Sequence, residues 1–296
     1  MNKIIVITGP TGVGKTKLSI ELAGIYNGEI INADSMQIYK GLDIGTAKVR
    51  DDEMNNIPHH LLSIKDVSNN YSVYDYQIDG RRVIEDIFNR GKVPIIVGGT
   101  GLYIKALLYD YDLSMEEDNN QYEEYSTSDL YDMLINMDKD SIDNIDKNNR
   151  RRIIRAINYY KNNGISITKN KTDKLLYDAI FIGLTTDRDN LYKIINNRVD
   201  IMINDGLVEE VKSFYDRGIS TKPLTGGIGY KELYKYFDGK CSLEEAIDEI
   251  KKNSRHYAKR QYTFFNNQLL IKWFNTDYDN FNNTIDEVCN YIDSNV

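Results

Sequence analysis

The amino-acid sequence predicts an α/β protein in which a parallel sheet is flanked by helices and interrupted by a small helical insertion. Short runs of β-branched and other apolar residues alternate with helical patterns through much of the chain. The first run leads into a glycine-rich loop and then a helix, the order expected of a strand, loop and helix unit. An acidic stretch without any strand signal breaks the alternation, and there we predict the insertion. Functional loops are expected at the carboxyl ends of the strands.

The predicted strands are the apolar runs at residues 3–8, 30–31, 93–97 and 179–182. A helical pattern at 15–26 follows the first run, and the chain after residue 187 is predicted to be mostly helical. Ser242 and Glu245 form a capping box that opens a long helix to about residue 266. Residues 269–274 are predicted as one last strand.

The predicted domain boundaries follow the charge pattern. Residues 110–146 hold thirteen acidic residues and one lysine, whereas residues 150–161 hold five basic residues and no acidic one. We therefore assign the helical insertion to residues 112–147 and the core domain to residues 1–111 and 148–296.

Composition excludes several classes of protein. A chain of 296 residues with 41% hydrophobic and 28% charged residues can bury a sizeable core and should fold. The two cysteines lie far apart, which argues against a disulfide framework or a zinc site. No signal peptide or membrane-length apolar run is recognisable, so we expect a cytoplasmic protein without a membrane partner. We also expect a monomer. The net charge of −8 argues against a protein that coats nucleic acid through bulk electrostatics.

The strongest motif is GPTGVGKT at residues 9–16, which fits the pattern GxxxxGK[ST] between a predicted strand and a predicted helix. Backbone N–H groups in such a loop wrap an anion, and the helix N-terminus adds its dipole. Lys15 supplies a point charge, and the Thr16 hydroxyl is a candidate Mg²⁺ ligand. The candidate phosphate-binding residues of the loop are Gly9, Thr11, Gly12, Val13, Gly14, Lys15 and Thr16. The motif predicts a P-loop NTPase-like fold and a bound polyphosphate, without saying which one.

Two further loops follow predicted strands. Asp34 would hold Mg²⁺ in an NTPase, would act as a general base in a transferase, or would simply cap a helix. Ser35 and Gln37 come next, and a Gln amide can pair with the donor and acceptor on an adenine edge. The third run ends in GGTGLY at residues 98–103, which suits close approach of backbone to a ligand better than nucleotide hydrolysis. A plain strand-to-helix turn explains that spacing almost as well.

Arg198 lies at the centre of an apolar helical stripe formed with Leu191, Ile195 and Met202. A guanidinium in such a place needs a partner. The partner is either a carboxylate in a structural ion pair or a phosphate of a ligand, and the sequence leaves both open.

Two helical segments carry one-sided basic faces. In the first, Arg151, Arg152 and Arg155 lie opposite apolar residues. In the second, Lys251, Arg255 and Lys259 belong to a basic half that also contains Lys252, His256 and Arg260. Charged helix faces are usually just solvated. Two such faces on an acidic protein nevertheless suggest local patches that follow an RNA backbone.

Taken together, these residues resemble the tRNA dimethylallyltransferases, also called isopentenyl-tRNA transferases. The resemblance runs from about residue 3 to residue 265. Besides the P-loop it is carried by the segments DSMQIY (34–39), GTAK (45–48), HHL (59–61), YSVYDY (71–76), GGTGLY (98–103), RRIIRA (151–156), RVD (198–200), GYKE (229–232) and YAKRQ (257–261). The sequence departs from the family in a shorter acidic insertion, in Asn149 before the arginine helix and at Gly226 and Gly227.

The resemblance implies transfer of a dimethylallyl group from its diphosphate to the exocyclic amine of the adenosine 3′-adjacent to the anticodon, with Mg²⁺. The implied catalytic residues are Asp34, as general base, and Thr100. Arg198 would bind the diphosphate together with the P-loop, and Thr16 would hold the metal. Contacts with the tRNA anticodon stem-loop are implied for Asp34, Ser35, Met36 and Gln37, besides the two basic faces. The adenine would have to be flipped out of its stack.

Three alternatives stay open at this stage. A nucleotide or small-molecule kinase would use the same loop with ATP, and Asp34 as metal ligand or base. A non-enzymatic P-loop protein could act as an RNA-binding switch. An enzyme that prenylates free AMP or ATP would need no grip on an anticodon loop, and the two basic helices argue against it.

Overall fold

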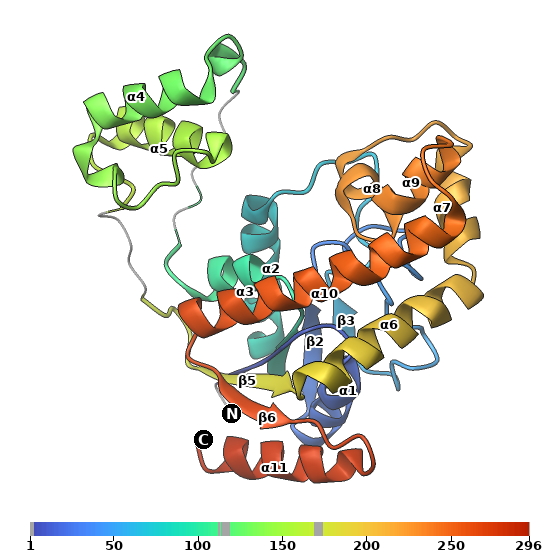
Figure 1. The fold of residues 1–296 in the computed structure, drawn as a ribbon. Coiled ribbons are helices and arrows are strands. Elements are labelled where there is room, and N and C mark those ends of the chain that lie inside the picture. Colours follow the sequence, from blue (N-terminus) through green and yellow to red (C-terminus); the bar gives the residue numbers. More distant parts are fainter. Residues whose placement is uncertain (1–2, 112, 114–118, 169–173, 296) are drawn as a thin grey trace. The chain divides into compact units, whose positions relative to one another are not determined.

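The structure is a computed structural model, and it describes residues 3–111, 113, 119–168 and 174–295. Six parallel strands form one sheet in the order β3-β2-β4-β1-β5-β6 (Figure 1). The strands are β1 (Ile4–Thr8), β2 (Gly28–Asn32), β3 (His59–His60), β4 (Val93–Val97), β5 (Ala179–Thr185) and β6 (Lys272–Asn275). The predicted parallel sheet is confirmed, and β3 is a strand that was not predicted.

The central strands are apolar because both faces of the sheet are covered. Every residue of β1 and β2 is buried, including Glu29 and Asn32, and β4 is buried except at Val97. A parallel strand covered on both sides has no polar face, so it reads as a continuous apolar run. In the register, Val97 of β4 pairs with Ile7 of β1 and with Asn32 of β2. The loops that follow these three strands therefore emerge side by side at the carboxyl edge.

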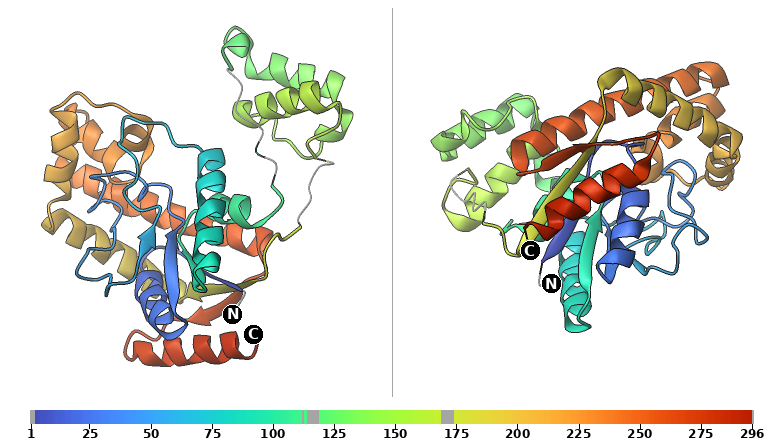
Figure 2. Two further views of the ribbon diagram at one scale, coloured as in Figure 1. Left: turned by 180° about the vertical axis from the view of Figure 1, so that it is seen from behind. Right: turned by 90° about the horizontal axis from the view of Figure 1, so that it is seen from below.

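Helices cover both faces of the sheet (Figures 1 and 2). Helix α1 (Lys15–Ile25) packs on β1, β2 and β4 and against α11 (Phe281–Asp293), which also packs on β6. Helix α2 (Val73–Asn89) packs on β2 and β4 and against α3 (Gly101–Leu108). Right-handed crossovers that run in opposite directions along a sheet put their helices on opposite faces, which accounts for this division. The two ends of the chain meet, since the Lys3 ammonium donates to the Asn295 carbonyl.

The chain after β5 is mostly helical, as predicted. The helices are α6 (Arg188–Asn204), α7 (Leu207–Tyr215), α8 (Lys222–Gly226), α9 (Tyr230–Phe237) and α10 (Leu243–Gln268). The predicted capping box is present: Ser242 accepts from the Glu245 amide, and Glu245 accepts from the Ser242 amide at 2.8 Å. Helix α10 passes over the carboxyl edge of the sheet, where Gln261 bonds to Gly99 and Tyr262 to Thr185. Helix α11 was not predicted.

Residues Tyr109–Leu176 form a second compact unit, separate from the sheet unit of Met1–Leu108 and Tyr177–Val296. It contains the 3-10 helices η1 (Asn119–Tyr122) and η2 (Lys139–Ser141) and the α-helices α4 (Thr127–Met137) and α5 (Arg150–Asn163). Its own core consists of Tyr122, Leu130, Leu134, Ile145, Ile153, Ile154, Ala156 and Ile157. The predicted boundary between 147 and 148 was therefore wrong. The apolar face of α5 packs on α4, so the arginine helix belongs to the insertion.

Within the described part of the chain, no helix combines the length and apolar character needed to cross a membrane. Of the predicted insertion, residues 112 and 114–118 lie outside the described residues.

Candidate active site

The P-loop joins β1 to α1 and has the backbone geometry that the motif predicts. Gly9, Gly12 and Gly14 have φ values of 137°, 86° and 90°, a region that side chains disfavour. A Cβ on Gly9 would lie 2.4 Å from the Leu184 carbonyl oxygen, so this position also requires glycine for space. Thr16 is exposed at the start of α1. The loop thus presents a helix N-terminus and a free hydroxyl at the carboxyl edge of the sheet.

Lys15 is held inside the loop, where its ammonium donates to the Pro10 carbonyl at 2.6 Å. Burial and the nearby Arg198 guanidinium lower the pKa of Lys15 to about 7, while Asp34 opposes that shift. Burial likewise lowers the pKa of Arg198, again opposed by Asp34. Two cations from different elements therefore meet one carboxylate at this loop. Such a pair of desolvated cations favours an anionic ligand.

Asp34 follows β2 and is half-buried beside Thr100. Its Oδ1 accepts from the amides of Met36 at 2.9 Å and Gln37 at 3.4 Å. Its Oδ2 faces Gly99, because a Cβ built there would lie 4.0 Å from it. The Thr100 hydroxyl oxygen accepts from the Ser35 amide at 3.1 Å, which ties the loop after β4 to the loop after β2. The structure thus brings together the predicted pair Asp34 and Thr100.

Arg198 and Gln37 meet on one acceptor, the backbone carbonyl of Thr46. The Gln37 amide donates to it at 3.1 Å and the Arg198 guanidinium at 3.5 Å. In the described part of the chain no ion pair within 4.0 Å joins Arg198 to a carboxylate, although Asp34 is near enough to act on its charge. A guanidinium held by a single long bond to a carbonyl retains donors for a ligand.

Tyr257 and Gln261 of α10 also belong to this site. Gln261 donates to the Gly99 carbonyl at 3.0 Å, and the Tyr257 hydroxyl lies 3.5 Å from the same oxygen. Burial and the nearby Asp34 raise the pKa of Tyr257 to about 12, so its phenol stays protonated at neutral pH. Neither residue was predicted as a site residue, because the interpretation of this helix considered only its basic half. Their presence in the segment YAKRQ was the signal that could have found them.

The glycines of residues 98–101 serve close approach within the protein. A Cβ on Gly98 would lie 2.2 Å from the Ala33 backbone, one on Gly99 2.2 Å from the Gln261 amide, and one on Gly101 2.2 Å from Phe264. These glycines therefore let the loop after β4 contact the loop after β2 and helix α10. The expected approach of this backbone to a ligand stays a prediction.

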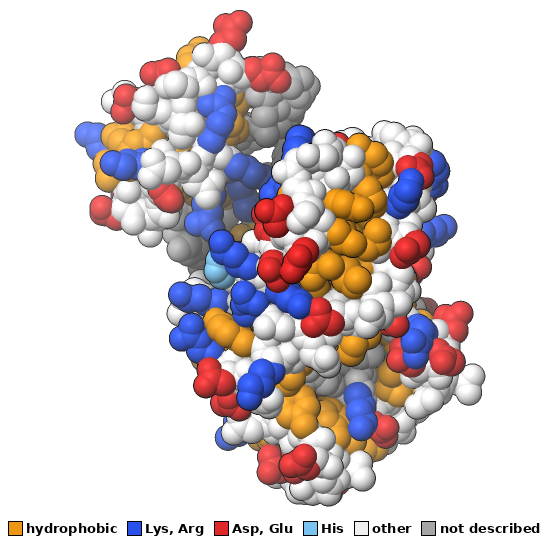
Figure 3. All heavy atoms as spheres, turned by 45° about the vertical axis from the view of Figure 1, so that its right-hand side comes forward, with side chains coloured by type: hydrophobic (Ala, Val, Ile, Leu, Met, Phe, Trp, Pro, Cys, Tyr) orange, Lys and Arg blue, Asp and Glu red, His pale blue; other side chains and the backbone are white. Residues whose placement is uncertain are grey.

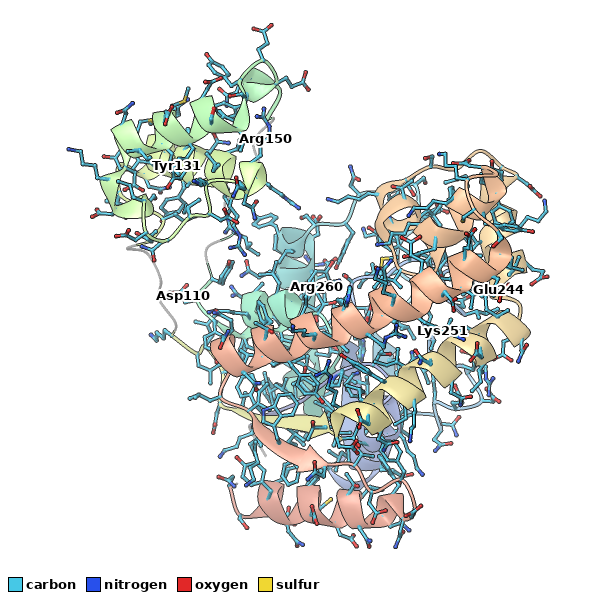
Figure 4. The ribbon with its side chains drawn as sticks, in the orientation of Figure 1. Asp110, Tyr131, Arg150, Glu244, Lys251 and Arg260 are labelled. Carbon is cyan, nitrogen blue, oxygen red and sulfur yellow. The ribbon has the colours of Figure 1, made fainter. Side chains whose placement is uncertain are left out.

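The basic face of α10 is divided between two environments. Lys251 forms an ion pair with Asp200 of α6 at 2.6 Å, and Arg255 donates to Asn196 of the same helix at 2.5 Å. The exposed basic residues of the helix are Lys252, His256, Lys259 and Arg260. Figure 4 labels Lys251 and Arg260 along α10, and the face drawn in Figure 3 shows Lys and Arg side chains gathered around a histidine. Of the three predicted tRNA contacts on α10, only Lys259 is fully open to a ligand.

On α5 the predicted basic face is present. Arg151 and Arg152 are exposed, and the Arg155 guanidinium lies 5.7 Å from the centre of the Tyr111 ring. Arg150, by contrast, donates to the carbonyls of Tyr122 and Tyr125, both at 2.6 Å, and so joins η1 to α5. Arg150 therefore stabilises the second unit, whereas Arg151 and Arg152 are exposed on its surface and Arg155 is half-buried.

No cluster of three or more His, Cys, Asp or Glu side chains arranged for a metal ion occurs in the described residues. Mg²⁺ usually keeps several waters and takes one or two protein ligands together with phosphate oxygens. The exposed Thr16 hydroxyl at the P-loop fits such a site, in which a phosphate-bearing ligand would supply the remaining charged ligands.

Comparisons with known proteins identify the family of this chain. The family model described as IPP transferase matches residues 37–268. A tRNA dimethylallyltransferase of Anoxybacillus flavithermus is 50% identical over 98% of this chain and 96% of its own length, and that of Bacillus subtilis is 46% identical over 92% and 90%.

Solved structures give the same result. A tRNA isopentenylpyrophosphate transferase of Staphylococcus epidermidis has a TM-score of 0.76 and 40% identity over the whole of both chains. A eukaryotic dimethylallyltransferase described as acting on tRNA has a TM-score of 0.81 and 31% identity over 92% of this chain and 74% of its own. Because the family model matches most of the chain and the relatives are at least 31% identical over nearly all of it, the chain belongs to the IPP transferase family.

Proposed function

We infer that the protein is a tRNA dimethylallyltransferase. It moves the dimethylallyl group from dimethylallyl diphosphate to the exocyclic amine of the adenosine 3′-adjacent to the anticodon, and it releases pyrophosphate. The observation that carries this inference is the juxtaposition of Lys15 and Arg198 with Asp34 and Thr100 at the ends of adjacent strands. The two cations, Lys15 and Arg198, fit a diphosphate leaving group. Asp34 and Thr100 fit an amine that must lose a proton.

The proposed chemistry needs both halves. The adenine amine is a weak nucleophile because its lone pair is delocalised into the ring. As its nitrogen bonds to C1 of the allyl group, the bond from C1 to the diphosphate oxygen breaks, and negative charge gathers on the leaving group. The P-loop amides, Lys15 and Arg198 would stabilise that charge. Mg²⁺ held by Thr16 and the diphosphate would neutralise part of it.

Asp34 is proposed as the base that takes the amine proton. Oδ1 is already fixed by two backbone amides, which leaves Oδ2 as the oxygen available to the substrate. Thr100 lies beside it and would orient the amine. Ser35, Met36 and Gln37 would contact the flipped adenine. Arg151, Arg152, Arg155 and Lys259 would contact the anticodon stem-loop backbone, and Lys251 and Arg255 would do so only after leaving α6.

The decisive experiment is a transfer assay with the purified protein and unmodified tRNA. Label from the allyl group of dimethylallyl diphosphate should move onto the tRNA and appear in the adenosine 3′-adjacent to the anticodon. Label from the γ-phosphate of ATP should not move. Transfer of the γ-phosphate would establish the kinase alternative, and prenylation of free AMP but not of tRNA would establish the other one.

A further inference from the structure

We propose that Glu210 is a positioning residue of the transfer reaction. It lies outside the site described above, on α7, and it holds the loop of residues 43–46 so that one backbone carbonyl orients both Gln37 and Arg198. The proposal rests on the proposed function.

The Glu210 carboxylate binds three consecutive backbone amides. Its Oε2 accepts from Asp43 at 3.0 Å and Ile44 at 2.7 Å, and its Oε1 accepts from Gly45 at 3.1 Å. The Tyr230 hydroxyl of α9 donates to the same Oε1 at 2.6 Å. Four donors on one carboxylate make a charge-assisted network that fixes the direction of the peptide chain.

Gly45 and Tyr230 make this arrangement specific. Tyr230 is fully buried, and a Cβ on Gly45 would lie 2.7 Å from its ring and hydroxyl. Only glycine lets the loop lie flat on the tyrosine ring. Burial and the adjacent Glu210 raise the pKa of Tyr230, so its hydroxyl remains a donor. Helices α7 and α9 together therefore hold the loop from one side.

The next residue carries the effect into the active site. The Thr46 hydroxyl donates to the Leu42 carbonyl at 2.7 Å, which closes the turn. The Thr46 backbone carbonyl accepts from Gln37 and Arg198. A shift of the loop would thus displace the proposed adenine contact and the proposed diphosphate contact at once. Displacements of about 1 Å from remote changes can reduce a rate by as much as about 100-fold.

The test uses Glu210→Gln in the full-length protein. Glutamine has one acceptor oxygen and turns an NH₂ group toward backbone donors, so the loop should shift. We expect the single-turnover rate constant of dimethylallyl transfer to fall by roughly 10- to 100-fold with full reaction amplitude. A purely structural role would instead reduce amplitude and melting temperature while leaving the rate constant unchanged, and that result would overturn the proposal.

Further variants sharpen the result. Glu209→Gln changes the exposed neighbouring carboxylate and should behave as wild type. Tyr230→Phe removes one donor but keeps the ring under Gly45, so its rate should fall less than that of Glu210→Gln. In combination with Gln37→Ala, the decrease caused by Glu210→Gln should be smaller than in the wild-type background, because both act through the Thr46 carbonyl. If the rate constant of the double variant fell by the full product of the two single decreases, an effect of Glu210 through the Thr46 carbonyl would be contradicted.

Calorimetric binding of inorganic pyrophosphate gives a readout that is independent of the reaction. Glu210→Gln should lower the affinity for pyrophosphate, because it displaces the Thr46 carbonyl that orients Arg198. Glu209→Gln should leave this affinity unchanged. Failure of the wild-type protein to use dimethylallyl diphosphate would count against the proposed function alone. An active wild type with an unchanged rate constant and pyrophosphate affinity in Glu210→Gln would count against Glu210.

Discussion

The two carboxylate oxygens of Asp34 have different surroundings. Oδ1 accepts from the Met36 and Gln37 amides, whereas Oδ2 lies 4.0 Å from the position that a Cβ on Gly99 would take and accepts no hydrogen bond from the described residues. The side chain thus fixes its own loop with one oxygen and offers the other to a ligand. A helix-capping role, the plain alternative from sequence, would explain only the first of these contacts.

This division yields the first prediction. Asp34→Asn keeps an acceptor for the two amides but cannot take a proton, while Asp34→Ala removes both properties. If Asp34 is the base, both variants should slow single-turnover transfer by roughly 10²–10⁴-fold, and Asn should retain the wild-type melting temperature. Near-normal rates for Asp34→Asn would assign the residue to loop structure alone. Rapid-quench assays together with thermal melts distinguish these results.

The second prediction concerns Lys15, whose pKa of about 7 lies far below that of an ordinary lysine. A bound diphosphate favours the charged form and raises that pKa, so binding takes up a proton when the free enzyme is partly neutral. Affinity for inorganic pyrophosphate should be greatest below about pH 7 and should fall by up to about tenfold per unit as pH rises above it. Calorimetry in buffers of different ionisation enthalpy measures the proton uptake.

Lys15→Arg provides the control, because a guanidinium keeps its charge throughout this pH range. Its pyrophosphate affinity should not show the decline above pH 7. A wild-type affinity that is flat from pH 7 to 9 would show that the ammonium is fully charged in the free protein.

At the scale of elements, the sequence predicted best where a local pattern decides the structure. The P-loop, the capping box of Ser242 and the strand ends at Asp34 and Thr100 all depend on neighbours within a few residues, and they were found. Tyr257, Gln261 and Glu210 act through partners more than a hundred residues away, or on other helices. Their roles depend on how α7 and α10 pack, which helical periodicity alone does not determine. The same reason explains why α5 was placed in the wrong domain.

Helix α10 shows this dependence clearly. The helical wheel predicted one continuous basic half on α10. In the structure α6 packs against part of that half, where Asp200 pairs with Lys251 and Asn196 accepts from Arg255. Charge on a helix face is thus available to a ligand only where no neighbouring helix covers it.

The third prediction follows for single substitutions on α10. If Lys259 contacts a tRNA phosphate, Lys259→Ala should weaken tRNA binding and reduce the salt slope of log K by about 0.7–0.9. Lys251→Ala should leave that slope unchanged and lower the melting temperature, because it removes the ion pair with Asp200. Filter binding at several salt concentrations tests both variants. Equal effects on the slope would mean that Lys251 leaves α6 when tRNA binds.

At the scale of the whole molecule, the second unit is inserted through two adjacent chain segments. Tyr109 and Leu175 form an antiparallel bridge, and the Asp110 amide donates to the Lys174 carbonyl at 2.9 Å. The unit also has a separate hydrophobic core. All the residues proposed to bind diphosphate or take the proton lie in the sheet unit, whereas Arg151, Arg152 and Arg155 lie in the insertion. The residues proposed for the transfer reaction and the arginines proposed to contact the tRNA backbone on α5 therefore belong to different units of the chain.

The last prediction uses that separation. Residues 111–173 can be replaced by a hairpin loop of about two to five residues, because the antiparallel bridge of Tyr109 and Leu175 and the bond from Asp110 to Lys174 already hold the two chain segments together. The shortened protein should fold and bind inorganic pyrophosphate with wild-type affinity, since the P-loop and Arg198 are retained. Its KM for tRNA should rise, and the salt slope of tRNA binding should drop by about 0.7–0.9 for each phosphate that α5 no longer neutralises.

The triple variant Arg151→Ala, Arg152→Ala, Arg155→Ala is the matched control: if it reproduces the change in slope, α5 binds these phosphates through charge. Unchanged tRNA binding in both proteins would show that the basic face of α5 is only solvated, and that the sheet unit alone recognises the anticodon stem-loop.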